Sequence, residues 1–424
     1  MALWGCGALG GHIALHLCRA GVSKIILWDK GFVTPGILVR QPYSLQSIGR
    51  RKVDAMKASL LDIRTDIEIE IHHSDLENTL SSPSSDWSSG IDAIIDATAS
   101  DAVRRRLDMV WNAGARPSVS LASLMIDQQA KRLVTAVVDR EYTGSTWDVL
   151  RKAKIETLRD SSYKEFSDAF FPSEFTKHPF QPEPGCSEPT FVGSSADSAA
   201  MASIGLNMIA HQLSRRDRKT ATVQFLSQAR EARDINSPPL AEFNFPPDFC
   251  LKTAAEELRI SPGAFQEMRG WIAQNRRLRG RAVETGGLVW GEWDDATGII
   301  WVSGFSGPPK DSRHSSDFFL RGIVGTKDEH EFRMASTRRS VGYIGEWHTH
   351  PISSPLPSGT DLLGMHANLT VGELPPHKSV LIIIGKEAGV ETIGAYLFRR
   401  RVRAGEMAVH ELNESRKPLP SPIL

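Results

Sequence analysis

Short apolar runs alternate with a glycine-rich turn and a longer periodic stretch at the start of the chain. Ala2–Trp4 form an apolar run that leads into the glycine-rich segment Gly5–Gly11. The pattern then predicts a helix over His12–Ala20 and a second buried strand over Lys24–Trp28, which ends at Asp29. Strand, glycine turn, helix, strand and acidic residue in this order indicate a nucleotide-binding α/β unit.

Further periodic stretches extend this unit. A third strand is predicted to end over Ile94–Thr98, and helices are predicted over Gly49–Leu61 and Ser195–Leu213. Another helix is predicted over Tyr142–Arg159, with its apolar side formed by Trp147, Leu150 and Ile155. The region around this helix, residues 140–190, is expected to be an insertion that carries a cysteine loop or contacts a partner.

Prolines divide the chain. Pro238, Pro239, Pro246 and Pro247 predict a linker over residues 236–247, between a first domain at 1–235 and a second at 248–410. In the second domain a helix is predicted over Pro262–Arg276, with Ser261 as its N-cap. The proline-rich end, residues 411–424, is expected to be a flexible tail. The predicted fold class is α/β, with a doubly wound N-terminal sheet and a smaller C-terminal α/β domain.

Composition supports two globular domains. The chain has 424 residues, 41% of them apolar and 24% charged. Its 50 basic and 50 acidic residues cancel, which argues against nucleic acid as a partner. No apolar run approaches the roughly 20 residues of a membrane span, and no secretory signal pattern opens the chain. Four cysteines do not form a disulfide scaffold in a chain of this length, so a cytoplasmic location is expected. The short run before the glycine turn predicts a truncated N-terminus.

The most specific chemical pattern lies near the C-terminal end. His348 and His350 are one residue apart in an expected strand, so both imidazoles project from the same side. Asp361 follows ten residues after His350, with Ser358 three residues before it. Two imidazoles, one carboxylate and one open position for water predict a catalytic zinc site. Incidental histidines in a surface loop are a poor alternative, because four residue types would have to coincide in spacing.

A second segment makes a resemblance specific. Glu284-Thr285-Gly286-Gly287 follows the predicted helix at 262–276, and His-Thr-His-Pro follows further on. Over residues 248–405 this pattern resembles the JAB/MPN (JAMM) metalloproteases. The resemblance implies that Glu284 is the general base, that zinc is bound by the two histidines and the aspartate, and that Ser358 supports the oxyanion. The substrate bond is then a peptide or isopeptide amide.

In the N-terminal domain, Gly5, Gly7 and Gly10 would let the backbone approach phosphate at a helix N-terminus. Asp29 would accept hydrogen bonds from ribose hydroxyls. These residues alone leave NAD and ATP both open.

Arg40, Gln41 and Lys52 favour ATP. With their surroundings they resemble the ThiF/MoeB and ubiquitin-activating-enzyme family over about residues 1–230. That resemblance implies that the three side chains reach the ATP phosphates and that Asp96 contacts the nucleotide and Mg²⁺. For Lys52, a solvated basic helix face remains the alternative.

Two positions depart from that family. Ile37 lies in the segment where relatives have an asparagine, and Ala99 replaces a second aspartate. Asp96 or Asp101 would then have to serve Mg²⁺.

Cys186 lies in a proline- and glycine-rich segment before the helix predicted at 195–213. In ubiquitin-activating enzymes a cysteine in such a crossover loop accepts the activated carboxylate as a thioester, and Cys186 matches in type and placement. An idle loop cysteine is the alternative. Cys6 and Cys18 are expected to be packing residues.

Together the two resemblances imply a bifunctional enzyme of bacterial ubiquitin-like conjugation systems, including antiphage operons. One half would activate a ubiquitin-like C-terminus with ATP and Mg²⁺, and the other would cut an amide at such a C-terminus with zinc. A conjugating-enzyme-like partner and a homodimer fit this setting. Two alternatives stay open: activation and trimming of a sulfur-carrier protein for biosynthesis, and an active protease beside a non-catalytic docking domain.

Overall fold

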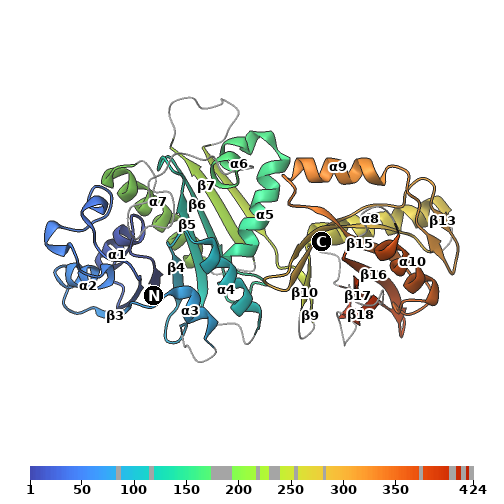
Figure 1. Ribbon diagram of the computed structural model, residues 1–424, viewed down its shortest axis with the longest axis horizontal. Coiled ribbons are helices and arrows are strands. Elements are labelled where there is room, and N and C mark those ends of the chain that lie inside the picture. The colour runs from blue at the N-terminus through green and yellow to red at the C-terminus, as the bar shows by residue number, and fades with distance from the viewer. Residues whose placement is uncertain are drawn as a thin grey trace. The chain divides into compact units, whose positions relative to one another are not determined.

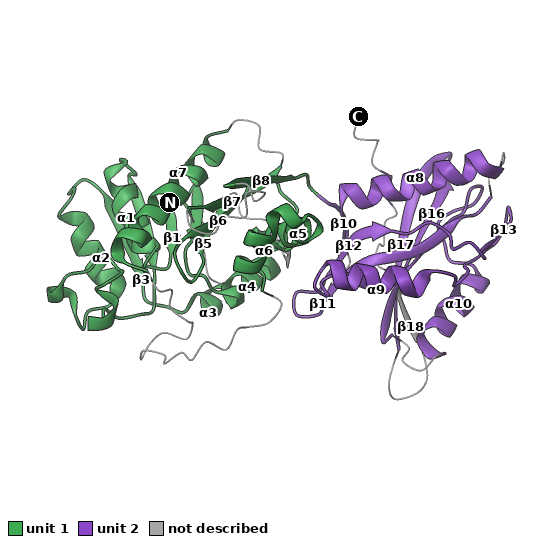
Figure 2. Cartoon of the chain, turned by 90° about the horizontal axis from the view of Figure 1, so that it is seen from above, with its two compact units in different colours: residues 1–247 green, residues 248–424 purple. Residues whose placement is uncertain are grey.

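The computed structural model describes residues 1–82, 87–113, 119–172, 193–215, 220–228, 239–252, 256–279, 283–371, 376–400, 407–411 and 417–419. The chain forms two compact units, Met1–Pro247 (unit 1) and Asp248–Leu424 (unit 2), which Figure 2 colours green and purple. No described helix combines the length and the apolar character that crossing a bilayer requires.

Unit 1 is built on an eight-stranded sheet in the order β3-β2-β1-β4-β5-β6-β7-β8 (Figure 1). Strands β1 to β5 are parallel, whereas β6, β7 and β8 each pair antiparallel with the strand before them. The bounds are β1 (Ala2–Trp4), β2 (Lys24–Trp28), β3 (Glu68–His72), β4 (Ala93–Asp96), β5 (Ser120–Ile126), β6 (Arg132–Val138), β7 (Ala221–Ser227) and β8 (Leu240–Phe245). Strand β1 pairs with both β2 and β4, so the strand order reverses at its carboxyl end, where the glycine-rich segment begins.

Helices cover both faces of this sheet. One apolar core joins the strands to α1 (Gly10–Arg19), α2 (Lys52–Leu61) and α7 (Ser195–Ser214). The other joins them to α3 (Leu76–Ser81), α4 (Asp101–Ala113), α5 (Thr146–Arg159) and α6 (Lys164–Phe170). The predicted doubly wound α/β class is therefore confirmed for this unit.

Unit 2 holds a sheet in the order β18-β17-β16-β15-β11-β12-β10-β9, with β19 also paired to β17. Strand β15 runs parallel to β16 and antiparallel to β11. The bounds are β9 (Phe249–Lys252), β10 (Glu257–Ile260), β11 (Gly286–Asp294), β12 (Ile299–Phe305), β15 (Gly342–Thr349), β16 (Lys378–Glu387), β17 (Val390–Arg400), β18 (Met407–Glu411) and β19 (Lys417–Pro418). A short hairpin of β13 (Arg313–His314) and β14 (Phe319–Leu320) stands apart from the sheet.

Among the described residues, three helices accompany this sheet. Helix α8 (Pro262–Arg279) packs its apolar side, Ala264, Phe265 and Met268, on one face. Helix α10 (Gly359–Thr370) packs Met365 and Leu369 against other residues of β16 and β17. Helix α9 (Thr326–Ser336) contacts β15. Strand β15 lies between β16 and β11 in the sheet, so it is a central strand.

Several predicted boundaries change. Helix α2 begins at Lys52 rather than Gly49, because Gly49 has a φ of +82° and Arg51 is extended. Residues 240–245 of the expected linker form β8, whose alternating side chains pair with β7. In the expected flexible tail, Lys417–Pro418 pair with β17 and Leu419 N donates to Glu391 O at 3.0 Å.

Candidate functional site

Strand β15 delivers the two histidines. It ends at Thr349, and His350 follows directly, with its backbone N–H donating to Ile384 O of β16 at 2.7 Å. The extended backbone therefore continues through His350, so both imidazoles lie on one side. Their Nε2 atoms are 3.1 Å apart, and both residues are buried. The predicted juxtaposition of His348 and His350 is present.

Asp361 comes to these histidines from the first turn of α10. Its Oδ1 lies 3.3 Å from His348 Nε2, and its Oδ2 lies 3.6 Å from His350 Nε2. Burial alone would raise the pKa of the Asp361 carboxyl, but hydrogen bonds from His348 and His350 hold it well below its usual range. Burial would likewise lower the pKa of His350, yet the bonds to Asp361 and to the Ser354 carbonyl raise it.

Ser358 orients Asp361 through a capping box. Ser358 is the N-cap of α10, and its Oγ accepts from Asp361 N at 3.2 Å. In return Asp361 Oδ2 accepts from Ser358 N and from Ser358 Oγ, both at 2.7 Å. The carboxylate is thus held by the helix terminus that it caps. The expected contact of Ser358 with an oxyanion stays a prediction.

These three side chains fit a zinc ion. The structure brings their ligand atoms within 4.8 Å of one another. Ligands at zinc distances of 2.0–2.1 Å in a tetrahedral shell are about 3.4 Å apart, which is close to the observed spacings. His350 Nδ1 donates to Ser354 O at 2.9 Å, which leaves Nε2 as the free ligand nitrogen.

Glu284 lies beside this cluster, just before β11. Its backbone N–H donates to Ser315 O at 2.7 Å, and its carbonyl oxygen accepts from His314 Nδ1 at 2.8 Å. Burial raises the pKa of the Glu284 carboxyl, against the lowering effect of the nearby His350 and His348 charges. His314 and Ser315, in the β13–β14 hairpin, were missed by sequence reasoning because nothing in the local sequence marks this clamp.

Gly286 and Gly287 let β11 approach its neighbours. Gly286 pairs with His348, and a Cβ there would lie 2.1 Å from Trp347 O. A Cβ at Gly287 would lie 2.4 Å from Ser306 O. A side chain at either position would push β11 away from its neighbours, so the glycine pair brings Glu284 close to the histidine strand.

We expect Ser358→Ala to weaken both α10 and metal binding. Losing an N-cap costs about 0.5–2 kcal/mol, and losing a partner of a metal ligand typically costs about 10–100-fold in affinity. Zinc competition with a chromophoric chelator measures the second effect, and Ser358→Thr should restore it. Ser194→Ala is the matched control, because Ser194 forms the same box with Asp197 at α7. Unchanged zinc affinity in Ser358→Ala would contradict the positioning role.

In unit 1 the glycine-rich segment forms the turn between β1 and α1. Gly5 has a φ of +87°, and a Cβ at Gly10 would lie 1.8 Å from Gly5 O, whereas nothing lies within 4 Å of one at Gly7. Asp29 fixes this turn, since its Oδ2 accepts from Cys6 N at 2.6 Å and its Oδ1 accepts from Gly31 N at 2.7 Å. Contact of Asp29 with ribose stays a prediction.

The other predicted nucleotide residues lie near this turn. Arg40 and Gln41 are buried, and Gln41 Oε1 has no hydrogen-bond partner within the described residues. The Lys52 side chain reaches Gly31, which neighbours the Asp29 carboxylate. Contact of Lys52 with the phosphates stays a prediction.

Asp96 ends β4, next to β1. Its Oδ1 accepts from Thr98 N at 2.9 Å and from Thr98 Oγ1 at 2.6 Å. Its Oδ2 is buried and lacks a hydrogen-bond partner in the part of the chain that the structure describes. Ala99 has a φ of +55°, an uncommon value for alanine. Cys186 lies outside the described residues, whereas Cys6 and Cys18 are buried as expected.

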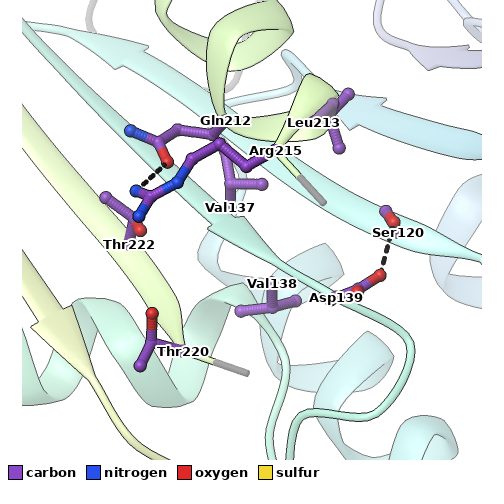
Figure 3. Close-up of a pocket in the computed structure, with 9 residues that line it drawn as sticks. All are labelled: Ser120, Val137, Val138, Asp139, Gln212, Leu213, Arg215, Thr220 and Thr222. Carbon is purple, nitrogen blue, oxygen red and sulfur yellow. Dashed lines mark hydrogen bonds between the residues drawn. The ribbon is translucent and has the colours of Figure 1, made fainter. Parts of the chain in front are cut away.

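A separate pocket of unit 1, shown in Figure 3, contains none of the predicted site residues. Its polar groups partly satisfy one another: Ser120 Oγ donates to Asp139 at 2.9 Å and Arg215 Nη1 donates to Gln212 at 3.1 Å. We assign no function to it.

Comparisons with known proteins agree with the two units. Residues 1–208 match the ThiF family, and residues 267–400 match the family described as prokaryotic homologs of the JAB domain. The chain is 29% identical over 119 residues to a CD-NTase/cGAS isopeptidase of Enterobacter hormaechei, covering 28% of this chain and 64% of that protein. It is 29% identical over 172 residues to a tRNA threonylcarbamoyladenosine dehydratase of Bacillus subtilis, covering 40% of this chain and 66% of that protein.

The chain therefore spans just under two thirds of these two relatives. Among solved structures, a crystal structure of PaaA aligns with a TM-score of 0.39 and 17% identity, over 57% of this chain and 71% of that one. The two family matches lie on the two units whose geometry is described above. The chain thus joins a ThiF family domain at its N-terminus to a prokaryotic JAB domain at its C-terminus.

Proposed function

We propose that unit 2 hydrolyses an amide bond at the C-terminus of a ubiquitin-like or sulfur-carrier-like protein, with zinc as its metal. The supporting observation is the cluster of His348 and His350, at the end of β15, with Asp361 of α10, whose charges act on Glu284 just before β11. The CD-NTase/cGAS isopeptidase relative supports an amide as the substrate bond.

Each side chain has a defined task in this reaction. His348, His350 and Asp361 would hold the metal, and Ser358 orients Asp361. When bound, zinc supplies Lewis acidity towards a carbonyl oxygen and towards water. The Glu284 carboxylate takes a proton from the attacking water and delivers it to the leaving nitrogen, so that a carboxylate and an amine are released.

The surroundings of the cluster suit a peptide segment. Exposed apolar side chains occur on the elements that carry it: Phe318 and Leu320 in the β13–β14 hairpin, Ile352 just after His350, and Leu363 in α10. Apolar contacts of this kind can hold an extended chain across the metal ligands.

The experiment uses a ubiquitin-like protein that is extended at its C-terminus by a short peptide. Zinc-loaded full-length chain should shorten it to a single defined C-terminus, which intact-mass spectrometry identifies. A substrate that stays intact with the loaded chain, while the metal is bound, contradicts the proposal.

For unit 1 we propose ATP-dependent adenylation of the same C-terminus. The glycine turn with Gly5, Gly7 and Gly10 beside Asp29 supports nucleotide binding, as does Lys52. Arg40 and Gln41 are proposed to contact the phosphates. Asp96 is proposed to hold Mg²⁺, because its Oδ2 has no hydrogen-bond partner among the residues that the structure describes. The relatives include a ubiquitin-like modifier-activating enzyme 5 of Caenorhabditis elegans, 33% identical over 73 residues (17% of each chain).

Exchange of labelled pyrophosphate into ATP tests this activity. The wild-type chain with its partner protein should catalyse the exchange, and Asp96→Ala should reduce it by about 10²-fold or more, as expected for loss of charge stabilisation. Asp101→Ala tests the other Mg²⁺ candidate, which is exposed and pairs with Arg104. Exchange kept in Asp101→Ala and lost in Asp96→Ala assigns the ion to Asp96. Wild-type chain without exchange would favour the non-catalytic docking domain.

Two classes of product separate the remaining alternatives. A thiol-labile adduct that is absent in Cys186→Ala would support conjugation through a thioester, with a conjugating-enzyme-like partner. Transfer of sulfur to the adenylate would support a sulfur carrier instead. Whether the chain is a homodimer and whether it serves antiphage defence belong to this proposal as well.

A further inference from the structure

One carboxylate outside the metal ligands lies on the same side of β15. Glu346 precedes His348 by two residues, so its side chain projects from the same face of the strand as the His348 imidazole. Its side chain is only 18% exposed. A carboxylate so far removed from water needs hydrogen-bond donors.

Glu346 has donors from two other elements. Its Oε1 lies 2.9 Å from Arg321 Nε and 2.8 Å from Arg321 Nη2. The same oxygen lies 2.5 Å from Asn368 Nδ2 of α10. Burial would lower the pKa of the Arg321 guanidinium, but the Glu346 charge outweighs this and raises it. The Arg321–Glu346–Asn368 cluster therefore joins β15 to the segment after β14 and to α10 through charge-assisted hydrogen bonds.

Through Arg321, Glu346 holds the segment that clamps Glu284. Arg321 directly follows β14, and this segment is closed by Asp311, which accepts from the backbone N–H groups of Ile323 and Val324, both at 3.0 Å. The hairpin within it supplies the His314 and Ser315 contacts to the Glu284 backbone.

Through Asn368, Glu346 holds the helix that carries Asp361. Asn368 and Asp361 are seven positions apart, which is two helical turns, so they lie on the same side of α10. The bond to Asn368 holds the C-terminal half of α10, and the capping box holds its first turn.

We propose that Glu346 is a positioning residue. It holds the β13–β14 hairpin, which contacts the Glu284 backbone, and helix α10, which carries Asp361, in register with β15 and its histidines. This inference rests on the proposed hydrolysis for its effect on rate. Its effects on the hairpin, the helix and metal binding do not require a substrate.

The test compares Glu346→Gln, Arg321→Met and Asn368→Leu in the full chain. Arg313→Met is the matched control, since Arg313 lies in the same hairpin, is exposed and makes no side-chain hydrogen bond or ion pair among the described residues. Hydrogen–deuterium exchange of the metal-free chain, zinc affinity by chelator competition, and kcat and KM are measured for each.

Glu346→Gln should speed exchange in both residues 311–323 and residues 359–370, and should lower kcat or zinc affinity by about 10–100-fold. KM should change less than kcat, because the Glu346 carboxylate contacts Arg321 and Asn368. Arg321→Met should affect the first segment alone, and Asn368→Leu the second together with zinc affinity. The control should match wild type.

The inference is overturned if Glu346→Gln leaves exchange in both segments unchanged. It is also overturned if exchange rises equally over β16 and β17, since that indicates general destabilisation, or if only KM changes. If the wild-type chain cleaves no amide, the proposed hydrolysis fails, and exchange and zinc affinity still decide the role of Glu346.

Discussion

Replacing Glu284 with glutamine should lower the rate of amide cleavage by about 10²–10⁴-fold, the range that general acid–base catalysis contributes. Glutamine keeps the size and the hydrogen-bonding capacity of the side chain but cannot accept the water proton. The backbone contacts with His314 and Ser315 do not involve the side chain, so the fold around Glu284 should persist. Initial rates with the extended ubiquitin-like substrate, measured beside zinc content, show the loss.

The control for Glu284→Gln is Asp317→Asn. Asp317 is an exposed acid of the same hairpin. Its charge raises the pKa of Glu284 and its Oδ1 accepts from Ser315 Oγ at 2.6 Å, but it is neither the proposed base nor a proposed metal ligand. The Asp317→Asn substitution removes a nearby negative charge, and the variant should cleave at nearly the wild-type rate. Cleavage retained by Glu284→Gln, or lost equally in both variants, would remove Glu284 from the role of base.

His348→Ala should abolish metal binding. It removes one of three protein ligands and leaves two, which is too few for a stable zinc site. Elemental analysis of purified protein should give about one zinc per wild-type chain and nearly none for the variant. At free zinc 100-fold above Kd, the wild-type fold gains about 2.7 kcal/mol against unfolding, and the variant should gain nothing.

His366→Ala serves as the control for His348→Ala. His366 is an exposed histidine of α10, close in sequence to Asp361. Its removal should leave zinc content and the zinc-dependent rise in melting temperature as they are in wild type. Zinc retained in His348→Ala at full stoichiometry would mean that the metal is held elsewhere.

Sequence reasoning recovered the elements whose pattern is local. The strand Lys24–Trp28 has the predicted bounds, and α7 ends within one residue of its prediction. In both, the apolar spacing and the flanking residues act over a few positions, so the pattern is readable without the fold. The pairing of His348 with His350 belongs to this class, because one residue separates them on an extended backbone. Their role as metal ligands, with Asp361, stays a prediction.

The rest depends on contacts between distant residues. Strand β8 was expected to be linker because prolines flank it on both sides, whereas its pairing with β7 decides its structure. The sequence predicted no role for Glu346, because its partners Arg321 and Asn368 lie 25 and 22 residues away from it. The hairpin clamp on Glu284 likewise spans 30 residues. Such partners are chosen by the fold.

The capping box of α10 also has a consequence for metal binding. The Asp361 carboxylate accepts from the backbone N–H and the hydroxyl of its own N-cap residue, Ser358, so the bonds that start α10 also aim this carboxylate at the histidines. A substitution that frays the first turn of α10 should therefore lower helix stability and metal affinity together.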